Sequence, residues 1–205
     1  MTVIDTNSNC INAIDMLLRK GVTAVGRYYR VVHPTWRLTR AEAQKLSGAD
    51  IRLFTVYEDT GSDLALTAAQ GVIDGINALE QAAMVDQPHR SAIYFSLQSP
   101  DGYGTPDLPA IRDYFTGVKA SIGSTYRLGV LGNGMVCRAL LDEGICSYAW
   151  LSASWEQPGT REFYRSGRWH LAQTAPVDQN WGGLSVDVNE AREEFGAFSV
   201  RVLVS

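Results

Sequence analysis

The feature that most constrains the fold is a regular alternation of short apolar runs with amphipathic segments. Eight runs have the length and boundaries of strands, at residues 3–7, 22–30, 51–57, 91–98, 126–131, 146–151, 169–174 and 184–188. Helical periodicity separates the first six of them, at residues 9–20, 39–46, 69–79, 106–121 and 135–142. Parallel strands need crossovers of about a dozen residues or more, so this alternation predicts a parallel sheet.

Eight strands favour a closed (β/α)8 TIM barrel, formed as one domain over residues 1–205, rather than an open doubly wound sheet. An open sheet of the nucleotide-binding type has a glycine loop after its first strand, and residues 5–9 contain no glycine. The helical signal between the last three strands is weak, which predicts loops or short turns there. The apolar run near the end, within residues 195–204, is expected to be a closing strand or a helix outside the barrel.

One helix carries a clear apolar stripe. Ala69, Val72, Ile73, Ile76 and Leu79 recur at the spacing of one helix face. We therefore expect this stripe to be buried.

The composition of the chain excludes several classes of partner. The net charge of −4 and the absence of Lys/Arg clusters argue against nucleic acid and against an anionic membrane as partners. Neither a general secretory signal nor a membrane-spanning stretch is visible, which predicts a protein made in the cytoplasm.

The three cysteines and three histidines show no metal-ligand spacing, so neither a metal nor a cofactor is expected. Buried thiols are the expected state of the cysteines, and a bridge between Cys137 and Cys146 remains an alternative.

Polar side chains gather where the strands end, and in a parallel barrel these ends share one mouth. The residues concerned are Asp5, Arg27, Tyr28, Glu58, Asp59, Ser96, Gln98, Asn133, Trp155, Gln173, Asp187 and Asn189, with Asp101 just beyond the fourth strand. Carboxylates can perform acid/base chemistry, amides recognise hydroxyl groups, and an indole packs on a sugar ring. This combination of carboxylates, amides and an indole predicts a carbohydrate-binding site.

Several strand motifs carry a resemblance. Val3-Ile4-Asp5-Thr6-Asn7, Val25-Gly26-Arg27-Tyr28, Ile93-Tyr94-Phe95, Leu128-Gly129-Val130-Leu131-Gly132 and Val186-Asp187-Val188-Asn189 resemble the strands of the bacterial glycoside-hydrolase-like domain of unknown function, a relative of the family 25 lysozymes. The resemblance implies a (β/α)8 barrel. It also implies a peptidoglycan-type substrate, which the lysozymes cleave between N-acetylmuramic acid and N-acetylglucosamine.

The sequence departs from the lysozymes at the fourth strand. Where they carry an Asp-x-Glu pair, with Glu as the acid, the matching residues here are Ser96 and Gln98, and an amide is a poor proton donor. The remaining carboxylates, Asp5, Glu58 and Asp187, are then the predicted catalytic residues, with Glu58 as general acid. The predicted substrate-binding residues are Arg27, Tyr28, Ser96, Gln98, Asp101, Asn133, Trp155 and Gln173, and Asp101 is also a further candidate acid.

Three alternatives remain open. Arg27 can neutralise the acidic cluster instead of binding substrate. The missing pair can mark a carbohydrate-binding pseudoenzyme. The turn Gly132-Asn133-Gly134 can hold the phosphate of a different substrate. If the substrate is cell-wall glycan, delivery requires a specialised export route, phage lysis or a larger assembly.

Overall fold

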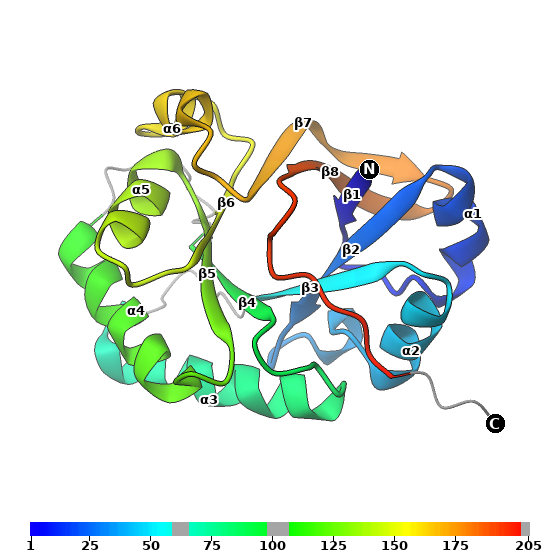
Figure 1. Ribbon diagram of the computed structural model, residues 1–205, viewed down its shortest axis with the longest axis horizontal. Coiled ribbons are helices and arrows are strands. Elements are labelled where there is room, and N and C mark those ends of the chain that lie inside the picture. Colours follow the sequence, from blue (N-terminus) through cyan, green and yellow to red (C-terminus); the bar gives the residue numbers. More distant parts are fainter. Residues whose placement is uncertain (59–65, 98–106, 202–205) are drawn as a thin grey trace.

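The computed structural model describes residues 1–58, 66–97 and 107–201. Eight strands form a closed barrel in chain order (Figure 1). They are β1 (Thr2–Asp5), β2 (Val22–Tyr29), β3 (Arg52–Tyr57), β4 (Ala92–Ser96), β5 (Arg127–Gly132), β6 (Tyr148–Leu151), β7 (Leu171–Trp181) and β8 (Leu184–Ala191). The predicted barrel is confirmed.

The α-helices pack around the outside. They are α1 (Ile14–Arg19), α2 (Arg40–Gly48), α3 (Ala68–Met84), α4 (Leu108–Ile122), α5 (Gly134–Asp142) and α6 (Thr160–Ser166), with short 3-10 helices at Ile11–Ala13 and Pro34–Trp36. Four of them are capped at the start by the residue before the helix, whose side-chain oxygen accepts a hydrogen bond from a backbone N–H of the first turn. The capping residues are Thr39, Thr67, Asp107 and Asn133. Helix α6 occupies a connection where the sequence predicted only loops or short turns.

The eighth strand runs in the opposite direction to the prediction. β8 is antiparallel to both β7 and β1, whereas β1 to β7 pair in parallel. The cause is the short connection through Gly182 and Gly183, whose φ angles of 61° and 95° suit glycine and close a tight hairpin. Asp5 consequently lies directly opposite Asp187.

The C-terminal segment closes the end of the barrel where the strands begin. Phe198 exchanges two backbone hydrogen bonds with Leu53 of β3, at 2.7 and 2.8 Å, and the segment runs past β3 to α2 (Figure 1). Phe195 is fully buried and packs edge-on against Phe54, with ring centroids 5.6 Å apart. Up to residue 201, where the described residues end, this segment is therefore neither a barrel strand nor a helix but an extended plug.

Helix α3 faces the opposite way from the prediction. Its buried positions are mostly small, Gly71, Gly75 and Ala78 among them, while Val72, Ile73 and Ile76 are exposed. Helix α4 approaches so closely that a Cβ on Gly71 would lie 2.0 Å from the Tyr114 carbonyl oxygen. No room is left for large side chains on the inner face.

All three cysteines are free and buried. Burial raises the pKa of Cys10 and that of Cys137 to about 12, which keeps both as thiols. In the described part of the chain, no helix combines the length and apolar character needed to cross a bilayer.

Candidate functional site

Two carboxyl groups face each other where β1 and β8 pair. Directly opposed residues of antiparallel strands have Cβ atoms about 4.5–5.5 Å apart on one face of the sheet, so Asp5 and Asp187 are neighbours. They lie in a hollow of about 40 Å³, lined by Asp5, Thr6, Asn7, Tyr28, Asp178, Ser185, Val186 and Asp187. Three of the predicted site residues, Asp5, Tyr28 and Asp187, meet here.

Asp5 is at the base of the hollow, with 1% of its surface exposed. Asn189 donates to its Oδ2 at 2.7 Å, and the Tyr28 hydroxyl donates to its Oδ1 at 3.2 Å. Burial and then the nearby charge of Asp187 raise the pKa of Asp5 to about 8, although hydrogen bonds from Asn189, Tyr28 and Gln173 oppose the rise. At neutral pH Asp5 is therefore mainly protonated.

Asp187 is more exposed and is held from two sides. The backbone N–H of Asp178 donates to Oδ1 at 2.6 Å, and the Gln173 amide donates to Oδ2 at 3.2 Å. Partial burial raises the pKa of Asp187, the Asp178 N–H bond lowers it, and the Asp178 carboxylate raises it. Gln173 thus bonds to both carboxyl groups, as predicted for a residue at the mouth.

Glu58 comes directly after β3 and forms an ion pair with Arg30. The Arg30 guanidinium lies 5.0 Å from the ring centroids of both Tyr28 and Trp36. This ion pair holds the Glu58 side chain, which is not among the residues that line the hollow around Asp5 and Asp187.

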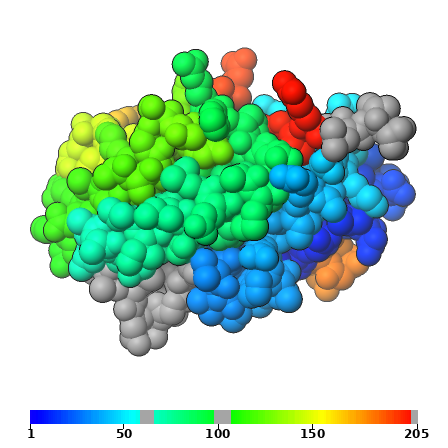
Figure 2. Space-filling view, turned by 90° about the horizontal axis from the view of Figure 1, so that it is seen from below, coloured from blue at the N-terminus to red at the C-terminus, as the bar shows by residue number. Residues whose placement is uncertain are grey.

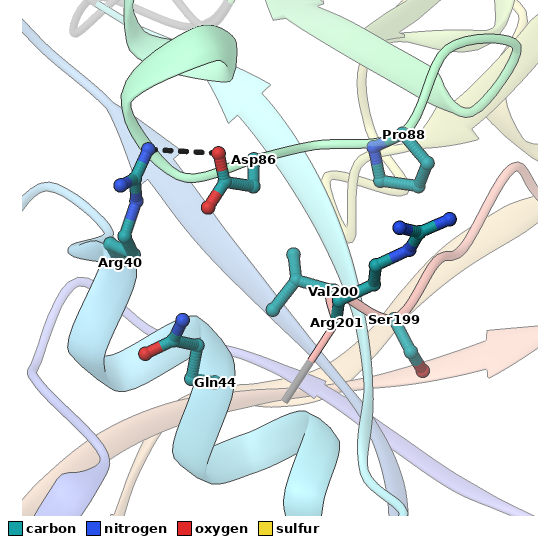
Figure 3. A pocket seen from close by; sticks show the side chains of 7 residues that line it. All are labelled: Arg40, Gln44, Asp86, Pro88, Ser199, Val200 and Arg201. Carbon is teal, nitrogen blue, oxygen red and sulfur yellow. Dashed lines mark hydrogen bonds and ion pairs between the residues drawn. The ribbon is translucent and has the colours of Figure 1, made fainter. Parts of the chain in front are cut away.

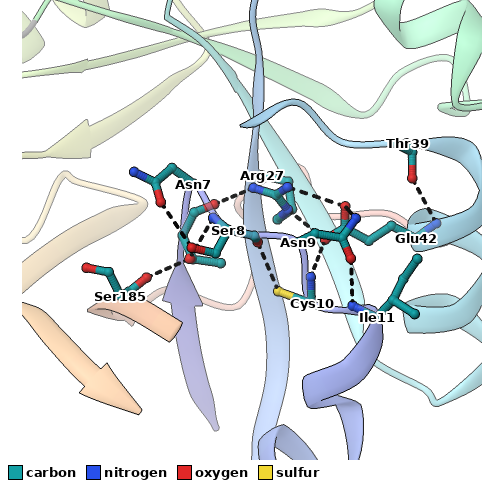
Figure 4. A network of polar contacts seen from close by, with 10 residues as sticks. Asn7, Ser8, Asn9, Cys10, Ile11, Arg27, Thr39, Glu42 and Ser185 are labelled. Carbon is teal, nitrogen blue, oxygen red and sulfur yellow. Dashed lines mark hydrogen bonds and ion pairs between the residues drawn. The ribbon is translucent and has the colours of Figure 1, made fainter. Parts of the chain in front are cut away.

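Arg27 does not reach the mouth. It lies on the outer face of β2, where its guanidinium is fully buried and pairs with Glu42 of α2 at 2.8 Å (Figure 4). It also donates to the Thr6 carbonyl oxygen. This geometry corrects both readings of Arg27, since it neither contacts the hollow nor pairs with the acidic cluster.

Asn133 caps a helix. Its Oδ1 accepts the Val136 N–H at 3.0 Å, while the Gly134 N–H donates to Thr160 Oγ1 and the Met135 N–H to the Pro158 carbonyl oxygen. The first N–H groups of α5 are therefore occupied. This arrangement disfavours the turn at residues 132–134 as a phosphate site.

Trp155 belongs to an aromatic stack beside α6. Its ring meets Tyr164 edge-on at 4.9 Å, and Tyr164 stacks on Trp169 at 5.5 Å. A shallow hollow of about 370 Å³ is lined there by Trp155, Glu156, Arg161, Tyr164 and Arg165. The residues of this hollow are different from those around Asp5.

A serine ends the fourth strand, and another directly follows the sixth. Ser96 is buried at the end of β4, and Ser152 follows β6 with a buried hydroxyl that finds no hydrogen-bond partner among the described residues. By the alternation of strand residues, both continue the inward-facing rows of Tyr94 and Trp150. The predicted residues Gln98 and Asp101 lie outside the described residues.

A further hollow of about 410 Å³ lies beside the C-terminal segment (Figure 3). It is lined by Arg40, Gln44, Asp86, Pro88, Ser199, Val200 and Arg201, with Arg40 paired to Asp86 at 2.8 Å. None of the carboxyl groups of the barrel mouth lines this hollow.

Sequence reasoning placed Asn189 at the mouth without a role, and it did not single out Asp178 or Ser152. Asn189 had a usable signal, because it lies two residues from Asp187 and so faces the same side of β8. Asp178 had none, since it comes from a bulged part of the β7–β8 hairpin. Among the described residues, no group of three His, Cys, Asp or Glu side chains has the geometry of a metal site.

Three solved structures illustrate the proteins that share this fold. The Tat-secreted protein Rv2525c of Mycobacterium tuberculosis, in complex with L-tartrate, is 25% identical with a TM-score of 0.79, covering 96% of this chain and 98% of that one. The catalytic domain of endolysin ply40 from bacteriophage P40 of Listeria monocytogenes is 11% identical with a TM-score of 0.59, covering 94% of each chain. The modular autolysin LytC from Streptococcus pneumoniae, in complex with a synthetic peptidoglycan ligand, is 14% identical with a TM-score of 0.55, covering 92% of this chain and 46% of that one.

The last two similarities concern the fold alone. No protein of curated function matches the sequence. The model of the family described as "Rv2525c-like, glycoside hydrolase-like domain" matches residues 15–191, which is most of the chain.

Proposed function

The chain belongs to the Rv2525c-like, glycoside hydrolase-like domain family, and we propose that it hydrolyses a glycosidic bond of bacterial cell-wall glycan. The observation that carries this proposal is the pair formed by Asp5 and Asp187. Most glycoside hydrolases use two carboxyl groups, one protonated and one ionised, on either side of the bond that is cleaved.

The two environments suggest a division of roles. Asp5, with its pKa raised to about 8, holds a proton at neutral pH and is suited to act as general acid. Asp187 is more exposed and accepts two hydrogen bonds, which suits an ionised group acting as base or nucleophile. Tyr28, Gln173 and Asn189 position the pair.

The substrate class rests on similar folds. An endolysin catalytic domain and an autolysin solved with a peptidoglycan ligand share the barrel. A glycan of the cell wall lies outside the cytoplasm, and the similar protein Rv2525c is described as Tat-secreted. We propose that this chain also acts after export.

The deciding experiment is the release of soluble fragments from purified peptidoglycan, followed by mass spectrometry. We expect wild-type protein to create new reducing ends, with a loss of about 100-fold to 10,000-fold in Asp5→Asn and in Asp187→Asn. The matched control is Asp86→Asn, an Asp far from the mouth on an exposed ion pair, which should retain activity.

The pH dependence of activity tests whether Asp5 acts as the general acid, which the loss of activity in the variants does not decide. Activity that needs a protonated Asp5 should fall as the pH rises through about 8. An unchanged profile in Asp5→Asn, or equal activity in all variants, would contradict the assignment.

A binding protein without turnover is the second candidate. It is favoured by the small hollow of about 40 Å³ and by the 1% exposure of Asp5, which leave little room for a sugar to reach the carboxyl group. Retention of the protein on insoluble peptidoglycan, without fragments at any pH and with no effect of Glu58→Gln, would support this reading.

A further inference from the structure

Helix α3 presents an apolar stripe to the exterior, centred on Val72, Ile73 and Ile76. The exposed fractions are 36% for Val72, 50% for Ile73, 46% for Ile76 and 50% for Met84. Val72, Ile73 and Ile76 lie within little more than one turn on one side of the helix, and Met84 lies eight residues beyond Ile76, past the exposed Glu80. Figure 2 views the molecule from the side of α3, and the helix (teal) lies at the surface across that face. Contiguous apolar surface of this kind marks interaction sites in soluble proteins.

The helix cannot roll to bury this stripe. A Cβ on Gly75 would lie 1.9 Å from Ser121 Oγ, and one on Gly117 of α4 would lie 2.0 Å from the Ala68 carbonyl oxygen. The Tyr114 hydroxyl also donates to the buried Asp74 carboxylate at 2.7 Å, which fixes the rotation of α3 on α4. The outward direction of Val72, Ile73 and Ile76 is thus built into the packing.

We propose that this face of α3 is a two-fold interface between two copies of the chain, with the two helices antiparallel and crossing near Ile73 and Ile76. Residues 67–79 carry Val72, Ile73 and Ile76 and end before Glu80. They contain one ionisable residue, Asp74, which is buried on the other side of the helix. An uncharged apolar face can be placed against itself without leaving a buried charge unpaired.

Charge selects the antiparallel arrangement. Glu80 is exposed and is the ionisable side chain closest to the end of the stripe. A parallel pair would bring the two Glu80 carboxylates together, whereas the antiparallel pair separates them. Each Glu80 then lies opposite Ala69 of the other copy, in the first turn of the helix, where the helix dipole favours an anion.

The expected dimer is weak. A helix of 17 residues is about 25 Å long, so its face supplies less than the roughly 800 Å² per partner of a standard interface. We therefore expect dissociation in the micromolar range. The stripe is on the outer wall, so the dimer leaves the barrel mouth open and is independent of the proposed catalysis.

The test is sedimentation velocity of the full chain from about 1 μM to a few hundred micromolar. We expect the wild-type protein to shift from monomer to dimer as concentration rises. Ile76→Lys should remain a monomer throughout, at least 10-fold weaker in association, with an unchanged circular dichroism spectrum. The matched control is Leu18→Lys, which alters another exposed apolar residue, 47% exposed on α1, and should dimerise as the wild type does.

The register has its own test. In the antiparallel pair Ile73 of one copy meets Ile76 of the other, so a mixture of Ile73→Lys and Ile76→Glu proteins should form a heterodimer although each alone is monomeric. A wild-type protein that stays monomeric at every concentration would overturn the proposal. Equal loss of dimer in Leu18→Lys, or no recovery in the mixture, would also overturn the interface described here.

Discussion

Two pairs of ionisable groups involve the first two strands, and they differ in charge: Arg27 of β2 pairs with Glu42, and Asp5 of β1 lies opposite Asp187. Arg27 and Glu42 are both fully buried, with opposite charges 2.8 Å apart. Asp5 and Asp187 are both acidic, and the contacts that satisfy them come from uncharged donors, Asn189, Tyr28, Gln173 and a backbone N–H. Like charges therefore meet only at the pair Asp5 and Asp187. A fold that retains such repulsion at one position marks that position as the candidate for chemistry.

The largest expected effect concerns Arg27 and Glu42, the pair whose charges are opposite. Arg27→Met leaves Glu42 as a buried charge without its partner, which should lower the free energy of unfolding by about 3–5 kcal/mol in urea titrations. The double variant Arg27→Met with Glu42→Leu should recover most of this loss. If the double variant is as unstable as the single one, the pair does not act through its charges.

The acidic pair should make stability depend on pH. The folded-state pKa of Asp5 is about 8, above the unfolded value of 3.8, so between these values the folded state binds one more proton than the unfolded state. Stability from this group is therefore fully present below about pH 4 and is lost as the pH rises to about 8, by a few kcal/mol. Urea titrations at several pH values should show this slope in the wild type and a flatter one in Asp5→Asn. An equal slope in both proteins would assign the pH dependence elsewhere.

A smaller effect is expected from the amide shared by the two carboxyl groups. Gln173→Leu removes hydrogen bonds that lower the pKa of Asp5, so that pKa should rise further. The loss of hydrogen bonds should cost about 1 kcal/mol of stability. Carboxyl-carbon NMR titration measures the shift, and Gln179→Leu, in the exposed part of the same hairpin, is the matched control.

The smallest effect on stability is expected at Asp178, an exposed residue that lines the hollow beside Asp187. The exposed Asp178 carboxylate raises the pKa of Asp187, while its backbone N–H lowers it. Asp178→Asn keeps the N–H and removes the charge, so the pKa of Asp187 should fall while stability changes by less than about 0.5 kcal/mol. The same NMR titration detects the shift, and an upward shift would show that the backbone bond had been lost.

The barrel could be predicted because strand and helix periods alternate plainly along the chain. The direction of β8 could not, because the apolar signal of β7 ends near Thr174 while the strand continues through polar, exposed residues to Trp181. Those polar residues read as a long connection, although they form a hairpin.

Some of the predicted site residues line the hollow and others do not, because a strand sequence does not show which side chains face inward. Asp5 and Tyr28 follow the inward alternation of β1 and β2, and the structure brings them together in the hollow. Arg27 is one residue out of phase with Tyr28, so it faces α2, and its partner Glu42 is 15 residues away with no local pattern to connect them. The stripe of α3 shows that helical period identifies an apolar face without saying what covers it.

The hydrogen bond from Asn189 to Asp5 joins residues 184 positions apart. Synthesis therefore delivers Asp5 184 residues before Asn189, and the segment that contains Phe195 follows. The described helices α1 to α6 all precede β8, the strand that completes the hollow. Any reactivity that depends on this pair of strands stays absent until Asn189 has left the ribosome.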